Sequence, residues 1–241
     1  MSKVVLVTGG SRGIGSAIVR VYASNGYDVV VNYVNSESKA FKLCNSLESE
    51  YGINALAIKC DVSDEDEVKL MIEEIVDRFG RIDVVVNNAG IAIDSVIDDK
   101  TKDTFRKILD VNLIGTFLVC KYASKYMKSG SIVNISSTNG IDSFYPFSMD
   151  YDASKAGLNI LTKDLAMEFA PRIRVNAVAP GWVNTDMNKL LDDEFISEES
   201  SKIGLGRFAE PSEIAKVVYF LSSDDASYIN GEIIKVDGGK K

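Results

Sequence analysis

Hydrophobic residues in this chain fall into two kinds of segment that alternate from one end to the other. Short continuous runs rich in Val and Ile are typical of strands that are buried on both faces of a parallel sheet. Longer segments repeat their hydrophobic residues every three or four positions, as amphipathic helices do. The pattern predicts strands at residues 4–8, 28–34, 54–60, 82–86, 131–135, 173–178 and 233–236.

Helices are predicted in the segments between these strands. The first ends at Asn25-Gly26, a common helix stop signal. The others are expected at residues 39–51, 63–80, 104–127, 151–169 and from 211 onwards. Since no linker, repeat or low-complexity tract interrupts the alternation, the sequence predicts an α/β fold: a single domain over residues 1–241, with a doubly wound, mostly parallel, seven-stranded sheet flanked by helices.

Composition narrows the class of protein. The 241 residues are 46% hydrophobic and 26% charged, as in ordinary globular proteins, and the net charge of −8 argues against nucleic-acid or anionic-membrane partners. No apolar run approaches the about 20 residues of a membrane span, and no secretory signal is apparent. The scattered Cys44, Cys60 and Cys120 are expected to be reduced thiols of a cytoplasmic protein. Histidine is absent, which excludes Ser-His-Asp and Cys-His catalysis and argues against a zinc enzyme.

A glycine-rich turn joins the first strand to the first helix. It reads Gly9-Gly-Ser-Arg-Gly-Ile-Gly15, and its spacing is a relative of the dinucleotide fingerprint GxGxxG. Glycines let the backbone approach a pyrophosphate, and the helix N-terminus supplies amide donors. The sequence therefore indicates a nucleotide-phosphate site, with a tight turn that binds no ligand as the alternative.

The end of the second strand bears on the choice of nucleotide. An NAD site has an acidic residue there to hold the ribose 2′-hydroxyl, whereas this strand is followed by no acid before Glu37. Arg12 in the glycine turn is then the nearest candidate to pair with a 2′-phosphate. The sequence favours NADP over NAD, although Arg12 is alternatively a solvated loop charge.

Polar and small residues follow four further strands, where ligands bind in doubly wound sheets. They are Asp61, Asn87-Asn-Ala-Gly90, Ser136-Ser137 and Pro180-Gly181. Asp61 either accepts a hydrogen bond from an adenine amino group or organises the turn into the next helix. The run ending at Gly90 is either a simple turn or leaves room for ribose and nicotinamide.

Tyr151 and Lys155 lie four residues apart at the start of a predicted helix, so they share one face of it. A phenol has a reference pKa near 10, and a neighbouring cation favours its ionised form. The pair is therefore a candidate for acid–base catalysis. The alternative is an ordinary helix residue beside a solvated charge.

Taken together, these motifs resemble those of the short-chain dehydrogenase/reductase family, over nearly the whole chain. The resemblance rests on Thr8 to Gly15, Asp61-Val62, Asn87 to Gly90, Asn112, Ser137, Tyr151-x-x-x-Lys155, and Pro180-Gly181 with Thr185. It implies a Rossmann domain and an NAD(P)-dependent carbonyl reductase. In the implied mechanism Tyr151 is the general acid, Ser137 hydrogen-bonds the substrate oxygen, Lys155 lowers the pKa of the phenol and binds the nicotinamide ribose, and Asn112 holds a water.

The resemblance also implies which residues contact the cofactor. They are Gly9, Ser11, Arg12, Gly13, Ile14, Gly15, Asn32, Asp61, Val62, Asn88, Ala89, Gly90, Tyr151, Lys155, Pro180, Gly181, Val183 and Thr185. No metal is expected. The family further implies a homotetramer built through the helices at about 104–127 and 150–170.

Within the family the chain is most similar to the 3-oxoacyl-acyl-carrier-protein reductases of fatty-acid synthesis. Ala92-Ile93 and the short turn at 171–174 depart from their usual pattern. Sugar or polyol dehydrogenases are the first alternative, and a non-catalytic nucleotide-binding regulator is the second. Residues 186–206 have the character of a substrate lid, with an amphipathic helix that simply packs on the domain as the alternative. A carrier-protein landing site is expected at Lys121, Lys125, Lys128 and Arg172, unless these are scattered solvated charges.

Overall fold

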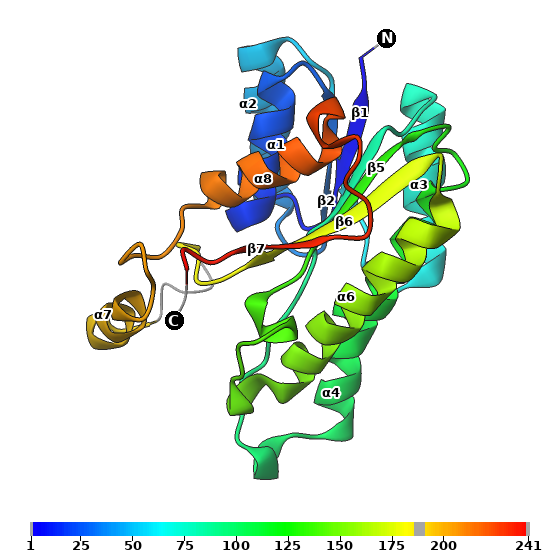
Figure 1. Cartoon of the computed structure of the whole chain (residues 1–241). Coiled ribbons are helices and arrows are strands. Elements are labelled where there is room, and N and C mark those ends of the chain that lie inside the picture. Colours follow the sequence, from blue (N-terminus) through cyan, green and yellow to red (C-terminus); the bar gives the residue numbers. More distant parts are fainter. Residues whose placement is uncertain (1, 186–190, 240–241) are drawn as a thin grey trace.

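The computed structural model describes residues 2–185 and 191–239. Within them, one seven-stranded parallel sheet has the strand order β3-β2-β1-β4-β5-β6-β7 (Figure 1). The strands are β1 (Val4–Val7), β2 (Asp28–Tyr33), β3 (Ala55–Lys59), β4 (Val84–Asn87), β5 (Gly130–Ile135), β6 (Ile173–Pro180) and β7 (Ile233–Val236). The predicted fold is confirmed, and the predicted strand bounds differ from these by at most two residues.

Helices cover both faces of the sheet. One face is packed by α1 (Gly13–Ser24), α2 (Glu37–Tyr51) and α8 (Pro211–Ser222), and the other by α3 (Glu65–Phe79), α5 (Gly115–Ala123) and α6 (Met149–Phe169). Two more helices, α4 (Lys102–Leu109) and α7 (Asp193–Ser201), lie beyond the edges of the sheet in Figure 1.

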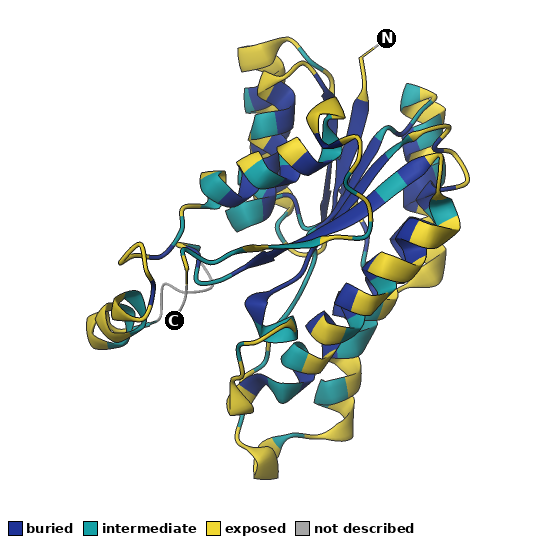
Figure 2. Ribbon diagram, in the orientation of Figure 1, coloured by how far each residue is buried: buried dark blue, intermediate teal, exposed yellow. Residues whose placement is uncertain are grey.

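The central strand β1 shows why its run of hydrophobic residues is continuous. Alternate side chains of a strand point to opposite faces. Val5 and Val7 accordingly pack with α1, α2 and α8, while Val4 and Leu6 pack with α3 and α5. Figure 2 shows the resulting distribution, with buried residues concentrated in the strands and on the helix surfaces that face them. A strand with helices on both sides needs apolar residues at every position.

The chain reverses its direction across the sheet between β1 and β4, and this reversal places the site. The N–H of Thr8, just after β1, donates to the carbonyl oxygen of Val86 in β4 at 3.0 Å. The Thr8 hydroxyl oxygen accepts from the backbone N–H groups of Asn88 and Ala89, each at 3.0 Å. Loops that leave adjacent strands in opposite directions open a crevice between them, and ligands of such sheets bind there.

One prediction about the helices is wrong. The helix expected at residues 104–127 is divided into α4, a π-helical turn at Asp110–Ile114, and α5, which ends at Ala123. A side chain on Gly115 would place its Cβ 2.8 Å from Val62, so only glycine lets the helix pass this close to the end of β3. The π turn directs Asn112 inwards, where it is fully buried. The backbone is thus irregular at a predicted catalytic residue, which is common for π turns.

The start of α3 also differs from the prediction. Asp64, not Ser63, caps this helix, because its carboxylate accepts from the N–H groups of Asp66 and Glu67, both at 3.0 Å. The three cysteines are free and buried, as expected. Among the described residues, no helix combines the length and apolar character needed to span a membrane.

Candidate active site

The glycine turn is tightly folded on itself. Gly9 and Gly13 have φ values of 60° and 53°, in the left-handed region that glycine adopts at little cost. A Cβ on Gly15 would lie 2.4 Å from the carbonyl oxygen of Gly9. The residue that precedes α1, Arg12, makes no side-chain capping bond, so the first amides of this helix are not capped by it. These features fit a bound pyrophosphate, for which backbone N–H groups are the usual donors.

Asn32 organises this turn from the end of β2. Its Oδ1 accepts from the N–H of Gly9 at 3.1 Å, and its Nδ2 donates to the carbonyl oxygen of Cys60 at 2.9 Å. The buried amide therefore ties together β2, the glycine turn and the end of β3. Its expected contact with a cofactor stays a prediction.

Asp61 does organise the turn into α3. Its Oδ1 accepts from the backbone N–H of Ser63 at 3.0 Å and from the Ser63 hydroxyl at 2.7 Å. The next residue, Val62, is buried against Gly115. These bonds support the turn-forming interpretation, and contact with an adenine amino group remains a prediction.

The segment after β4 approaches both the glycine turn and the candidate catalytic residues. The Nδ2 of Asn88 donates to the carbonyl oxygens of Thr8 and Gly9, at 2.9 and 3.1 Å. A Cβ on Gly90 would lie 3.3 Å from Oδ1 of Asn112 and 3.7 Å from Nζ of Lys155. Thr8 was not predicted as a site residue, although a polar residue that directly follows a buried apolar run is a usable signal.

The end of β6 lies beside the same turn. A Cβ on Gly13 would lie 3.6 Å from the methyl group of Thr185, and the N–H of Gly181 donates to Val236 at 3.1 Å. Thus Thr185 approaches the glycine turn, as the family resemblance implies. The expected cofactor contacts of Pro180, Gly181, Val183 and Thr185 stay predictions.

Three predicted catalytic residues meet where β5 ends and α6 begins. Ser137 interacts with the phenol of Tyr151 and acts to lower its pKa, and the Ser137 hydroxyl accepts from the N–H of Asn139 at 3.2 Å. Nζ of Lys155 lies 5.5 Å from the centre of the Tyr151 ring and donates to the carbonyl oxygen of Ile135 at 2.7 Å. By contrast, the other serine, Ser136, is engaged with Asn159 at 2.6 Å. The geometry thus favours Ser137 over Ser136 as the residue that faces a substrate.

Burial is the main cause of the shifted pKa values of Tyr151 and Lys155. It raises the pKa of Tyr151 to about 12, an effect that the hydrogen bond from Ser137 opposes and the negative charges of Asp152 and Asp94 reinforce. Burial lowers the pKa of Lys155 to about 8. Desolvation of the phenol is the largest of these effects. The expectation that Lys155 lowers the pKa of the phenol stays a prediction. The phenol stays protonated at neutral pH, which is the form that a general acid needs.

Asn112 clamps the segment after β4 to α6. Its Oδ1 accepts from the N–H of Ile91 at 2.8 Å, and its Nδ2 donates to the carbonyl oxygen of Ile91 at 2.9 Å and to the Ser154 hydroxyl at 3.1 Å. The residue thus joins two segments that flank the cluster. Its implied role in holding a water stays a prediction.

Part of the predicted lid, residues 186–190, lies outside the described residues. The remainder is anchored by Trp182, whose Nε1 donates to Glu199 in α7 at 2.8 Å. The indole also stacks on Phe208 at 5.4 Å and meets the edge of Phe195 at 5.6 Å. Trp182 therefore fastens α7 to the end of β6, which is compatible with the predicted lid.

The chain is similar to known reductases over nearly its whole length. A family model described as Enoyl-(Acyl carrier protein) reductase matches residues 9–241. The chain is 43% identical over 243 positions to the 3-oxoacyl-[acyl-carrier-protein] reductase FabG of Staphylococcus aureus, which covers 99% of this chain and 98% of that protein. It is 41% identical to the protein of the same name from Thermotoga maritima, with 98% and 97% covered.

Solved structures show the same likeness. A dehydrogenase/reductase from Sinorhizobium meliloti superposes with a TM-score of 0.94 at 35% identity, covering 99% of this chain and 95% of that one. Acetoin dehydrogenase YohF from Salmonella typhimurium superposes with a TM-score of 0.90 at 35% identity, covering 100% and 96%.

Proposed function

Since the chain belongs to the short-chain dehydrogenase/reductase family, as its motifs indicate, we propose that it reduces 3-oxoacyl thioesters carried by an acyl-carrier protein, using NADPH. It is an NAD(P)-dependent oxidoreductase, so the alternative of a non-catalytic nucleotide-binding regulator is set aside. The observation that carries the choice of reaction is the meeting of a protonated phenol, a serine hydroxyl and a buried ammonium at Tyr151, Ser137 and Lys155.

When bound, NADPH would supply a hydride to the carbonyl carbon of the substrate. The carbonyl oxygen gains negative charge as this happens. In our proposal Tyr151 gives its phenolic proton to that oxygen, and the Ser137 hydroxyl, which interacts with the phenol, donates a hydrogen bond to the same oxygen. A ketone, a hydride and a proton together make the secondary alcohol. Stabilising the developing oxyanion with preorganised donors is the largest part that a protein contributes to such a step.

Proton transfer leaves Tyr151 as a phenolate, which must be neutralised. Lys155 is the candidate cation, since its Nζ lies 5.5 Å from the ring centre. Its pKa of about 8 makes it a far stronger acid than an ordinary lysine and so suits it to returning a proton. Lys155 therefore serves as the local proton source in our proposal.

Apolar residues beside the cluster support an acyl substrate. Phe144 and Phe147, which lie between Ser137 and Tyr151 in the chain, are 84% and 44% exposed. The loop after β4 approaches it through a hydrogen bond from the N–H of Ser95 to the carbonyl oxygen of Phe147, at 3.0 Å. That loop exposes hydrophobic side chains of its own. An apolar border at the catalytic serine suits a hydrocarbon chain better than a sugar.

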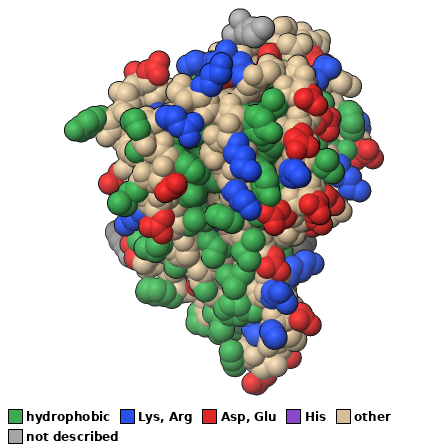
Figure 3. Space-filling model, turned by 90° about the vertical axis from the view of Figure 1, so that its right-hand side faces the viewer, with side chains coloured by type: hydrophobic (Ala, Val, Ile, Leu, Met, Phe, Trp, Pro, Cys, Tyr) green, Lys and Arg blue, Asp and Glu red, His purple; other side chains and the backbone are tan. Residues whose placement is uncertain are grey.

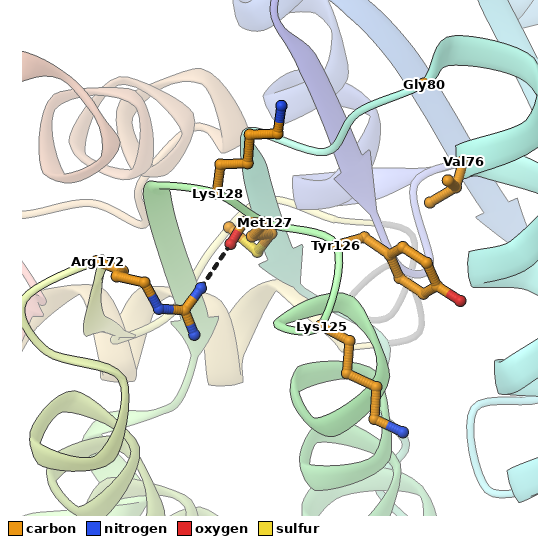
Figure 4. Close-up of a pocket in the computed structure, with 7 residues that line it drawn as sticks. All are labelled: Val76, Gly80, Lys125, Tyr126, Met127, Lys128 and Arg172. Carbon is orange, nitrogen blue, oxygen red and sulfur yellow. Dashed lines mark hydrogen bonds between the residues drawn. The ribbon is translucent and has the colours of Figure 1, made fainter.

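Three of the four basic residues expected to form a carrier-protein landing site line one pocket. Lys125, Lys128 and Arg172 line it together with Tyr126, and the guanidinium of Arg172 donates to the carbonyl oxygen of Met127 at 2.8 Å (Figure 4). Lys121, by contrast, forms an ion pair with Glu65 at 2.6 Å and does not belong to the pocket. Three cations on a protein of net charge −8 form a local basic patch of the kind that attracts acidic partners. The pocket lies where β5 and β6 begin, at the opposite end of the sheet from Tyr151, so it does not support delivery of an acyl chain to Tyr151 from a carrier bound there.

A homotetramer remains part of our proposal. The helices expected to form its contacts expose large hydrophobic side chains, namely Ile114, Phe117, Ile160 and Met167. Figure 3 shows hydrophobic side chains gathered on this side of the molecule. Apolar surface of this kind is typical of protein interfaces.

Arg12→Ala is expected to weaken the binding of NADPH about tenfold or more, as loss of a charge-assisted hydrogen bond to the 2′-phosphate would do. NADH has no phosphate there, so its binding should change by less than about twofold. Fluorescence titration of both nucleotides measures the difference. Arg20→Ala is the matched control, because Arg20 is also exposed and lies on α1, the helix that Arg12 precedes. Equal losses for the two nucleotides would show that Arg12 does not select NADP.

The proposed reaction is tested by following NADPH oxidation with a panel of carbonyl compounds. The panel holds an acetoacetyl thioester on acyl-carrier protein and on coenzyme A, together with acetoin and several sugars. We expect the two thioesters to react faster than acetoin and the sugars. Small ketones are the second candidate, because one similar structure is an acetoin dehydrogenase. Turnover of acetoin or a sugar alone would refute the acyl-thioester proposal.

A further inference from the structure

A buried ion pair lies next to the catalytic tyrosine, although no motif indicated it. Nζ of Lys100 lies 2.6 Å from Oδ1 of Asp150, and the two side chains are only 5% and 0% exposed. Lys100 also donates to the carbonyl oxygen of Ile93 at 2.8 Å. The other carboxylate oxygen of Asp150, Oδ2, is buried and has no hydrogen-bond partner among the described residues. An ionised carboxylate in such a place depends on its counter-ion, which here is Lys100.

Asp150 holds the backbone of the tyrosine. The N–H of Tyr151 donates to Oδ1 of Asp150 at 3.0 Å, the same oxygen that receives Lys100. The carboxylate therefore connects the first turn of α6 to Lys100 and, through it, to Ile93. Both side chains of this connection, those of Asp150 and Lys100, are charged.

A second connection runs in parallel and is neutral. The carbonyl oxygen of Tyr151 accepts from the Ser154 hydroxyl at 2.7 Å. Ser154 in turn accepts from Asn112, which holds both backbone groups of Ile91. Both connections thus join Tyr151 to the same loop, which leaves β4 beside the predicted nicotinamide site. Residues held in this way keep a reacting group within the narrow geometry that catalysis requires.

The charged connection affects the phenol as well as the backbone. Negative charges already surround this site, because Asp94 from the loop and Asp152 from α6 both act to raise the pKa of Tyr151. Asp94 interacts with Lys100 and Asp150 as well. Lys155 lies on the ring of Tyr151 as the opposing cation. A further uncompensated carboxylate would therefore disfavour the phenolate, because buried charges are poorly screened.

We propose that Asp150 is a positioning residue for Tyr151 and that Lys100 is its built-in counter-ion, so that a carboxylate holds the tyrosine backbone without adding net charge beside the phenol. This inference rests on the proposed function of Tyr151 as the proton-transferring group. It concerns two residues of this chain that are 50 positions apart and act only through the tyrosine.

The test uses the oxidation of 3-hydroxybutyryl-coenzyme A by NADP⁺, which requires the phenolate form of Tyr151. Lys100→Met leaves the negative charge of Asp150 without its counter-ion. This charge disfavours the phenolate of Tyr151, so the pH profile of kcat/KM should move to higher pH. Asp150→Asn leaves the positive charge of Lys100 without its counter-ion. This charge favours the phenolate of Tyr151, so the pH profile of kcat/KM should move to lower pH. We expect the two profiles to be separated by at least about 0.5 pH unit, with the wild type between them. Lys100→Met/Asp150→Asn should return close to the wild-type profile. Coinciding profiles for the two single variants would overturn the inference.

Thermal unfolding supplies a readout that does not need activity. Each single variant leaves an unpaired buried charge and should melt several degrees below the wild type, whereas the double variant should recover most of the loss. A double variant that loses the sum of both single losses would overturn the pairing. The control is Arg81→Met, which removes a half-exposed ion pair of equal length with Asp83 at the other edge of the sheet and should shift no pH profile. Should the wild type oxidise no 3-hydroxyacyl thioester, the proposed function fails, and the unfolding cycle alone decides whether Lys100 compensates Asp150.

Discussion

Tyr151→Phe is expected to lower kcat for ketone reduction by about 10²- to 10⁴-fold, the range for loss of a general acid. The change removes one oxygen and keeps the ring, so the helix start and the neighbouring Lys155 should be undisturbed. NADPH binding should stay within about threefold of the wild type, since the glycine turn is unaffected. Stopped-flow or steady-state assays give kcat, and fluorescence titration gives the affinity.

The control for this variant is Tyr219→Phe. Tyr219 lies on α8, where its ring packs against those of Tyr22 and Tyr27, and it takes no part in the candidate site. The same atom is lost, yet kcat should remain at the wild-type value. Full activity of Tyr151→Phe would reject the proposed mechanism altogether.

Lys155→Met should also abolish most activity, and it should do so while making the protein more stable. At neutral pH the buried ammonium carries a charge that its surroundings disfavour, as its pKa of about 8 indicates. Each unit of pKa shift corresponds to about 1.4 kcal/mol. After allowing about 1 kcal/mol for the lost hydrogen bond to Ile135, we expect a gain of about 2 kcal/mol in the free energy of unfolding at pH 7.

The pH dependence of this gain follows from linkage. Between about pH 8 and 10.5 the unfolded chain keeps the lysine proton and the folded protein does not, so the stability of the wild type rises with pH over that interval. The methionine variant lacks this rise. The advantage of Lys155→Met should therefore shrink by pH 10, as urea unfolding at the two pH values can measure.

Lys163→Met is the matched control for Lys155→Met. Lys163 lies on the same helix, but its side chain is exposed, so its removal should change neither activity nor unfolding by more than about 0.5 kcal/mol. A Lys155→Met protein that is less stable than the wild type at pH 7 would contradict the assignment of a strained buried charge.

Local sequence was sufficient to predict those parts of the molecule that depend on neighbours in the chain. The runs at β1 and β4 are continuous because each strand is covered on both faces, and that property is visible in the sequence. The spacing of Tyr151 and Lys155 follows from helix geometry alone. The position of the crevice could be predicted as well, because the carboxyl ends of parallel strands all lie at the same edge of the sheet.

Features that depend on distant contacts were not predictable in this way. The π turn that directs Asn112 inwards depends on the passage of Gly115 against Val62, which no periodicity records. The pairing of Lys100 with Asp150 joins two separate segments and has no local signal. The rise in the Tyr151 pKa could not be predicted from sequence either, because the extent of burial of the phenol is a property of the folded protein.

The turn at residues 238–239 is hydrogen-bonded to the end of the predicted lid. The N–H groups of Gly204 and Leu205, at the end of the predicted lid, donate to the carbonyl oxygens of Gly239 and Gly238, at 3.1 and 3.0 Å. The end of the predicted lid is therefore bonded through its backbone to residues 238–239. A substitution that shifts the backbone of Gly238 or Gly239 is expected to shift the end of the predicted lid with it.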